Sequence, residues 1–160
     1  MNYLKLNQLN VLKRALLIIL FAGFYFIGLR PIRSNVADLI KNKIEVSGVD
    51  QFQQSSVGIT TVYSDGNFSK KFVFKVPFGM FFLFSSVCLI WLQARWKDFG
   101  ILIIIQIGFW IIAFLSFIQG SNGNLFFLEI MDFLTRYLSP LGSLGLPIYL
   151  MYRRKKEDSE

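Results

Sequence analysis

Four apolar stretches divide the chain, and three of them contain no charged residue: 15–29, 76–92 and 99–118. An α-helix rises about 1.5 Å per residue and a bilayer's hydrocarbon layer is about 30 Å thick, so about 20 apolar residues cross it. The pattern therefore predicts transmembrane helices over 15–30, 76–93 and 99–118. The third stretch is long enough alone, whereas the first two reach this length with flanking residues.

The fourth apolar stretch, 133–152, is less regular because it contains an arginine, two prolines and two glycines. Proline and glycine are tolerated in a membrane helix where neighbouring helices satisfy the freed backbone groups. We therefore predict a kinked fourth transmembrane helix. Small residues in it, together with Gln106 in the middle of the third span, are expected to pack helix against helix: Ser139, Gly142 and Ser143.

The polar segment 31–75 separates the first two spans and changes its periodicity halfway. Val36, Leu39, Ile40 and Ile44 recur at helical spacing, which predicts a short amphipathic helix. Two alternating runs, 57–63 and 71–76, then flank Asp65-Gly66, a sequence typical of a hairpin turn. The segment is thus predicted to form a helix followed by a β-hairpin.

A two-stranded hairpin is only marginally stable in water, so this one needs cover from the preceding helix, the membrane surface or a partner. A connection of this length between helices is usually functional, although it could also only fill space between the spans. We predict that its apolar face binds a partner protein. The candidate residues are Val57, Ile59, Thr61, Tyr63, Phe72 and Phe74.

Residues 124–136 combine apolar side chains with a polar cluster. Glu129, Asp132 and Arg136 fall at positions i, i+3 and i+7, so a helix gathers them on one face. This pattern favours an interfacial amphipathic helix with its polar side in water. The alternative is a carboxylate pair, Glu129 and Asp132, that performs acid–base chemistry in a membrane-facing cleft.

Composition narrows the chemistry. The chain is 54% hydrophobic with a mean hydropathy of +0.50, where about 45–50% apolar residues is usual in soluble domains. It has no histidine and one cysteine, Cys88, which excludes a Ser-His or Cys-His dyad, an imidazole metal site and an internal disulfide. We expect no catalytic residue, metal or cofactor.

The net charge of +7 comes from basic residues that flank the apolar stretches. They form no stripe with exposed aromatic residues, so membrane lipid is the expected partner and nucleic acid is not. Four consecutive basic residues in the tail 153–160 favour a cytoplasmic C-terminus, and four spans then place the tail 1–14 on the same side. Residues 31–75 would be extracytoplasmic.

The layout resembles that of the small multi-span proteins encoded beside exosortases in Bacteroidota-type bacteria. The features that carry the resemblance are an uncleaved first anchor, the stretch FVFKVPFGMFFLF at 72–84, three further spans, and a composition rich in Phe, Ile, Leu, Asn and Lys. The resemblance implies an accessory to such an enzyme in the bacterial inner membrane. Exosortases resemble transpeptidases that use Cys, Arg and His, so no catalytic residue carries over to a chain without histidine.

The sequence therefore predicts an all-α integral membrane protein with four transmembrane helices and a small extracytoplasmic helix plus β-hairpin element. The leading functional hypothesis is a non-enzymatic accessory subunit that docks a partner protein in a sorting, secretion or envelope-assembly complex. One alternative is a small membrane enzyme or lipid-handling protein that uses Glu129 and Asp132. A transporter or channel subunit is less favoured, because such proteins carry charges near the membrane centre.

Overall fold

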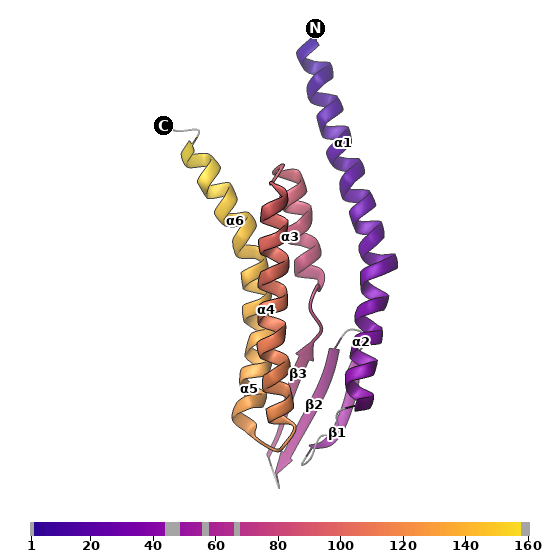
Figure 1. Cartoon of the computed structure of the whole chain (residues 1–160), viewed down its shortest axis with the longest axis vertical. Helices are drawn as coiled ribbons and strands as arrows, with labels where there is room; N and C mark the ends of the chain where they lie inside the picture. Colours follow the sequence, from indigo (N-terminus) through magenta and orange to yellow (C-terminus); the bar gives the residue numbers. More distant parts are fainter. Residues whose placement is uncertain (1, 44–48, 56–57, 66–67, 158–160) are drawn as a thin grey trace.

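The computed structural model of the chain describes residues 2–43, 49–55, 58–65 and 68–157, and it is mostly helical with one small sheet (Figure 1). In chain order the elements are α1 (Asn2–Phe24), the π-helical segment η1 (Tyr25–Leu29), α2 (Arg30–Lys43), β1 (Val49–Ser55), β2 (Gly58–Asp65), β3 (Phe68–Lys75), α3 (Met80–Trp91), α4 (Trp96–Gly120), α5 (Leu125–Phe133), the π-helical segment η2 (Leu134–Leu138) and α6 (Ser139–Glu157). The start of α1 and the end of α6 lie at one end of the molecule, and the sheet lies at the other.

The first helical column runs without a break through α1, η1 and α2 (Figure 1). We predicted a span that ends at residue 30 and a separate amphipathic helix, so the continuity corrects that expectation. Pro31 lacks an N–H, and its ring crowds the carbonyl four residues earlier in a regular helix. The π-helical segment widens the helix just before this position, and the N–H of Arg30 donates to the carbonyl of Tyr25, five residues back.

The last helical column, α5–η2–α6, also has a π-helical segment just before a proline. The side chain of Asn124 caps its start by accepting the N–H of Phe126 at 3.2 Å. The π-helical segment η2 ends two residues before Pro140, and the N–H of Ser139 donates to the carbonyl of Leu134. The predicted interfacial helix 124–136 and fourth span 133–152 are therefore parts of one helix, which continues through Pro147.

The two middle helices differ in length. Helix α4 has 25 residues and covers the predicted span 99–118. Helix α3 has only 12 residues, about 18 Å at the usual rise, so the predicted helix over 76–93 is too long. Among the described residues, two helices are long and apolar enough to cross a membrane, Asn10–Lys41 and Trp96–Gly120.

The sheet has three antiparallel strands in the order β1-β2-β3. The predicted hairpin is confirmed by the pairing of β2 with β3, in which Ile59 lies opposite Phe74 and Thr61 opposite Phe72. Residues 66–67 and Val57 lie outside the described residues. Strand β1, which pairs with β2, was not predicted from the sequence.

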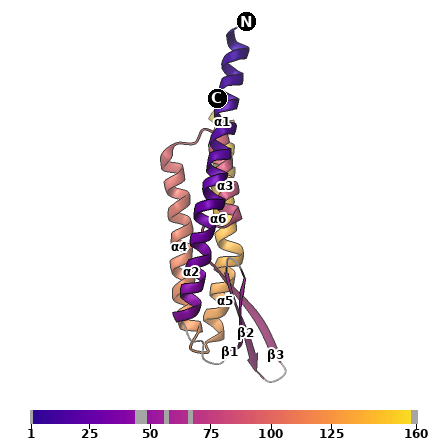
Figure 2. The ribbon, with the colours of Figure 1, turned by 90° about the vertical axis from the view of Figure 1, so that its right-hand side faces the viewer.

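One face of the sheet forms the larger apolar core together with α2, α4 and α5. Phe74 is fully buried and stacks on Phe117 of α4, with ring centroids 5.2 Å apart and planes 14° from parallel. Ile40 of α2 and Met131 of α5 belong to the same cluster. Figure 2 shows the strands alongside the ends of these helices, so the cover that the hairpin requires comes from the chain itself.

Candidate functional site

The predicted partner-binding face of the hairpin is a core face. Ile59, Thr61, Phe72 and Phe74 are each at most 1% exposed, and Tyr63 is half-buried against the same cluster. The four buried side chains are not accessible to another protein, whereas Tyr63 remains partly exposed. The expectation was wrong for these four residues because helices of the same chain cover this face of the strand pair.

The two outer edges of the sheet differ. At the β3 edge, the N–H of Val73 donates to the carboxylate of Asp132 at 2.8 Å, and its carbonyl accepts the hydroxyl of Thr135 at 2.7 Å. Side chains of α5 and η2 therefore occupy the ladder position at Val73 that a fourth strand would use. Among the described residues, β1 pairs with β2 on one side, and no fourth strand lies along its other edge.

The polar cluster of α5 and η2 faces the sheet. Asp132 accepts from Val73 and pairs with Arg136 at 2.9 Å, while Glu129 forms an ion pair with Lys70 of β3. The Asp132 side chain is 17% exposed, so the predicted orientation of this face toward water is wrong for this carboxylate. Both carboxylates fasten the helix to the sheet.

Gln106 forms hydrogen bonds with two of the residues predicted to pack helix against helix, Ser139 and Ser143. Its side chain is 3% exposed, and its amide nitrogen donates to the hydroxyl of Ser139 at 3.1 Å and to the hydroxyl of Ser143. Ser85 of α3 donates to the carbonyl of Ser143 at 2.7 Å, which links a third helix to the group. A Cβ at Gly142 would lie 2.9 Å from the ring of Phe109, so α4 and α6 approach closely there.

The non-helical residues 76–79, between β3 and α3, need partners for their backbone groups. Phe78 has φ +61°, which is unusual for a residue with a bulky side chain, and its N–H donates to the amide oxygen of Gln106 at 3.1 Å. The carbonyl of Val76 accepts from the guanidinium of Arg33 at 2.9 Å. Sequence reasoning treated Arg33 only as a flanking charge, because nothing in the local pattern indicates that it is buried.

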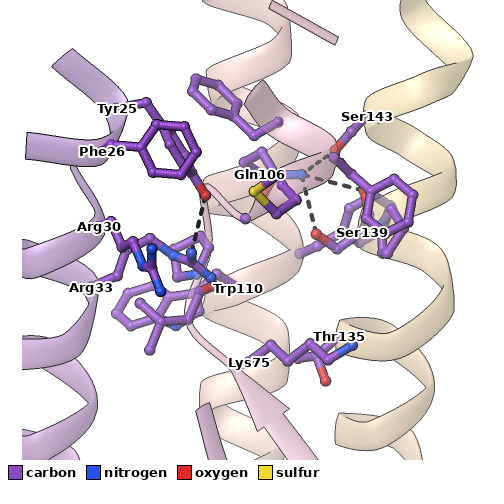
Figure 3. Close-up of a pocket in the computed structure, with 18 residues that line it drawn as sticks. Tyr25, Phe26, Arg30, Arg33, Lys75, Gln106, Trp110, Thr135, Ser139 and Ser143 are labelled. Atoms are coloured by element: carbon purple, nitrogen blue, oxygen red, sulfur yellow. Dashed lines mark hydrogen bonds between the residues drawn. The ribbon is translucent and has the colours of Figure 1, made fainter. Parts of the chain in front are cut away.

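A cavity of about 470 Å³ lies beside this junction (Figure 3). Its walls come from η1, α2, the 75–82 segment, α4 and the η2–α6 region, so both π-helical segments contribute to it. Such segments are frequent at functional sites. Figure 3 shows Arg30 and Arg33 on one side, Gln106 and Trp110 at the centre, and Thr135, Ser139 and Ser143 on the far side.

The cavity is cationic. Arg30, Arg33 and Lys75 line it, and no described residue of its lining is acidic. Arg33 is 6% exposed and donates to the hydroxyl of Tyr25 at 3.3 Å, yet none of the ion pairs in the described part of the chain includes it. Its Nε and the indole N–H of Trp110 are buried without a partner. The lining thus offers positive charge that no described acidic residue of the cavity balances.

The described residues contain no group of three or more Cys, Asp or Glu side chains that could hold a metal ion. Cys88 is half-buried in α3. The chain matches no protein-family model, and no curated protein or solved structure is significantly similar to it.

Proposed function

We propose that the protein is a multi-pass membrane protein with four membrane-crossing segments. The support is the apolar surface that its helices leave exposed, including Leu16 and Ile27 in the first column, Phe84 in α3, Ile104 in α4 and Leu141 in α6. Monomeric soluble proteins rarely expose continuous apolar surface on this scale. Exposing these side chains to water is unfavourable. In a bilayer they contact acyl chains that are equally apolar, so this unfavourable free energy is absent.

Helix α3 has 12 residues and is too short to cross a bilayer alone, so the non-helical residues 76–79 before it must form part of the crossing. Non-helical backbone at membrane depth is tolerated where it is buried in protein and its polar groups are satisfied. Arg33 and Gln106 supply partners for Val76 and Phe78 in that segment. The second crossing is then made by α3 together with the packed residues 76–79.

Within this setting, the function we propose is that of a non-enzymatic accessory subunit whose sheet docks an extended segment of a partner protein. The observation that carries it is the asymmetry of the sheet. Asp132 and Thr135 occupy the outer edge of β3 at Val73, whereas among the described residues no strand pairs with the outer edge of β1. An uncovered strand edge binds an incoming strand through main-chain hydrogen bonds. Because side chains occupy the β3 edge at Val73, the incoming strand is expected to pair with β1.

The resemblance to exosortase-associated proteins suggests the setting: a bacterial inner membrane, both termini in the cytoplasm, and a partner in sorting, secretion or envelope assembly. The enzyme alternative has less support, because Glu129 and Asp132 are both engaged in holding β3. Replacing both by their amides tests it, since full function of that variant removes a catalytic role. A transporter or channel role has no specific observation in its favour.

The register of the sheet selects the residues for a docking experiment. The N–H of Val73 points away from β2, and Val73 lies opposite Thr60, which lies opposite Gln53. Because hydrogen-bonded and non-bonded pairs alternate along an antiparallel ladder, Gln53 bonds to β2 and the backbone of Gln54 points outward. Gln54→Pro removes an outward N–H and spares the internal ladder, whereas Gln54→Ala keeps it.

We expect a photo-crosslinking residue at position 53, opposite the half-buried Thr60, to give a discrete adduct in cells that make the protein at its natural level. The same residue at Gln119, exposed in the last turn of α4, is the control and gives no such adduct. In the chain with the cross-linker at position 53, Gln54→Pro should abolish the adduct and Gln54→Ala should preserve it. Equal adducts at positions 53 and 119, or survival of the adduct in Gln54→Pro, would contradict docking at this edge.

A further inference from the structure

We infer that the cavity between η1, α4 and the η2–α6 region binds the anionic headgroup of a membrane lipid. Arg30, Arg33 and Lys75 bring three cationic side chains to its lining, without a described acidic residue among them. Cations gathered around one cavity favour an anion. The attraction is strongest at the buried Arg33, because charges attract more strongly where water is excluded, whereas Arg30 and Lys75 are exposed. Phosphate suits this set, since arginine presents several donors to its oxygens.

Two residues of the cavity wall, Arg33 and Trp110, each carry a buried donor without a partner. The Nε of Arg33 and the indole N–H of Trp110 are buried without a partner, although most buried polar groups in proteins are hydrogen-bonded. Arg33 itself is fixed by Tyr25 and by the carbonyl of Val76, so its guanidinium does not depend on a ligand for its position. Arg33 is therefore a positioned positive charge in the wall of the cavity.

The apolar walls of the cavity select a lipid among phosphate-bearing molecules. Phe26, Met80 and Phe81 line it and are each about half exposed, so the cavity continues onto the apolar outer surface of the helices. An acyl chain can leave along this surface while the headgroup stays among the cations. Its volume of about 470 Å³ lies in the usual range for ligand sites.

The position along the helix agrees with a headgroup. Arg14, in α1 of the first column, donates to the carbonyl of Trp91 and lies over the Trp91 ring. Sixteen residues separate Arg14 from Arg30, which corresponds to about 24 Å of helix. That distance approaches the thickness of a hydrocarbon layer, so the cations of the cavity lie near the other headgroup level.

The inference rests on the proposed membrane setting, and the experiment separates the two. With Trp91 and Trp96 replaced by Phe, Trp110 is the remaining indole of the chain. The full-length protein is reconstituted in phosphatidylcholine vesicles that contain a small fraction of lipid brominated near the start of its acyl chain, either phosphatidylglycerol or phosphatidylcholine. Bromine quenches a nearby indole, so quenching reports which lipid occupies the cavity.

We expect brominated phosphatidylglycerol to quench Trp110 several times more strongly than the same fraction of brominated phosphatidylcholine. Arg30→Gln with Lys75→Gln should reduce the relative affinity for phosphatidylglycerol roughly tenfold, because each cation near the membrane surface contributes to binding anionic lipid. The matched control is Lys41→Gln with Lys71→Gln. It removes the same charge from α2 and β3 at exposed residues that do not line the cavity.

Arg33 is left intact in these variants because it also supports the fold. Equal helix content by circular dichroism, and equal quenching by brominated phosphatidylcholine, establish that both double variants fold and insert. No quenching by either lipid would defeat the membrane setting itself. Equal quenching by the two lipids, equal loss in both double variants, or reversal of the phosphatidylglycerol effect by millimolar inorganic phosphate would overturn the lipid site.

Discussion

The amide oxygen of Gln106 accepts the N–H of Phe78 at 3.1 Å, and Phe78 has φ +61°. This contact joins the middle of α4 to the turn by which β3 passes into α3. A bulky residue in the left-handed region costs roughly 1–3 kcal/mol, so the surrounding structure must hold it there. Gln106 does so while its nitrogen is fixed by Ser139 and Ser143.

Gln106→Leu should lower the free energy of unfolding by about 2 kcal/mol, since it leaves the buried N–H of Phe78 without an acceptor. Unfolding by SDS in mixed micelles measures the change. Gln119→Leu, at an exposed position of the same helix, is the control and should change stability by less than about 0.5 kcal/mol. Equal stability of the two variants would show that the contact with Phe78 contributes nothing.

The two carboxylates of α5 should differ sharply in their effect on stability. Asp132→Ala removes the acceptor of the Val73 N–H at a position that is 17% exposed, so we expect a loss of about 2 kcal/mol. Glu129→Ala breaks an ion pair whose side chains are 43% and 46% exposed, and water screens such pairs to about 0–1 kcal/mol. Thermal unfolding in detergent checks both, and a larger effect at Glu129 would contradict the assigned roles.

The sequence pattern predicted those elements whose residues repeat regularly within a short stretch of chain. The alternation on either side of Asp65-Gly66 predicted the β2–β3 pair, and the uncharged stretch 99–118 predicted α4. The continuity of the helix through Pro31 was missed, because proline usually ends a helix and the compensating π-helical segment has no clear sequence signal.

Partners of the site residues depend on tertiary packing, which the sequence pattern does not contain. The apolar face of the hairpin was recognised, but whether Phe72 and Phe74 meet another protein or α4 is decided by how the chain folds back. Arg33 has the same local context as Arg30, three residues earlier, yet one is buried and the other exposed. Only the arrangement of the surrounding elements separates them.

Phe74 and Phe117 should be energetically coupled across the sheet–helix boundary. Removal of the fully buried ring in Phe74→Ala should cost about 3–5 kcal/mol, and a double-mutant cycle with Phe117→Ala should give a coupling of about 0.5–1.5 kcal/mol. Phe84→Ala, at a ring that is 64% exposed, is the control and should cost far less. Additive effects of the first two variants would indicate that the stacked contact is not formed.

The proposed orientation predicts which cysteines can be labelled from outside intact cells. In a Cys88→Ala background, Lys71→Cys on exposed β3 should react with a membrane-impermeant maleimide, because the sheet lies outside the membrane in this proposal. Lys13→Cys, near the opposite end of the molecule, should react only after permeabilisation. The reverse pattern would invert the orientation, and reaction of both cysteines in intact cells would contradict the separation of the two ends by a membrane.

Gly142 and Gly145 of α6 offer a matched test of helix packing. A Cβ at Gly142 would lie 2.9 Å from Cε2 of Phe109 and 3.1 Å from Cγ2 of Ile105, whereas a Cβ at Gly145 meets nothing within 4 Å. Alanine has a better helix propensity than glycine by about 1 kcal/mol, so Gly145→Ala should leave stability equal or improved. Gly142→Ala gains the same propensity but forces α4 and α6 apart, which typically costs about 1–3 kcal/mol. SDS unfolding should therefore place Gly142→Ala below Gly145→Ala by about 2 kcal/mol, and the opposite order would contradict the close approach of these two helices beside Gln106.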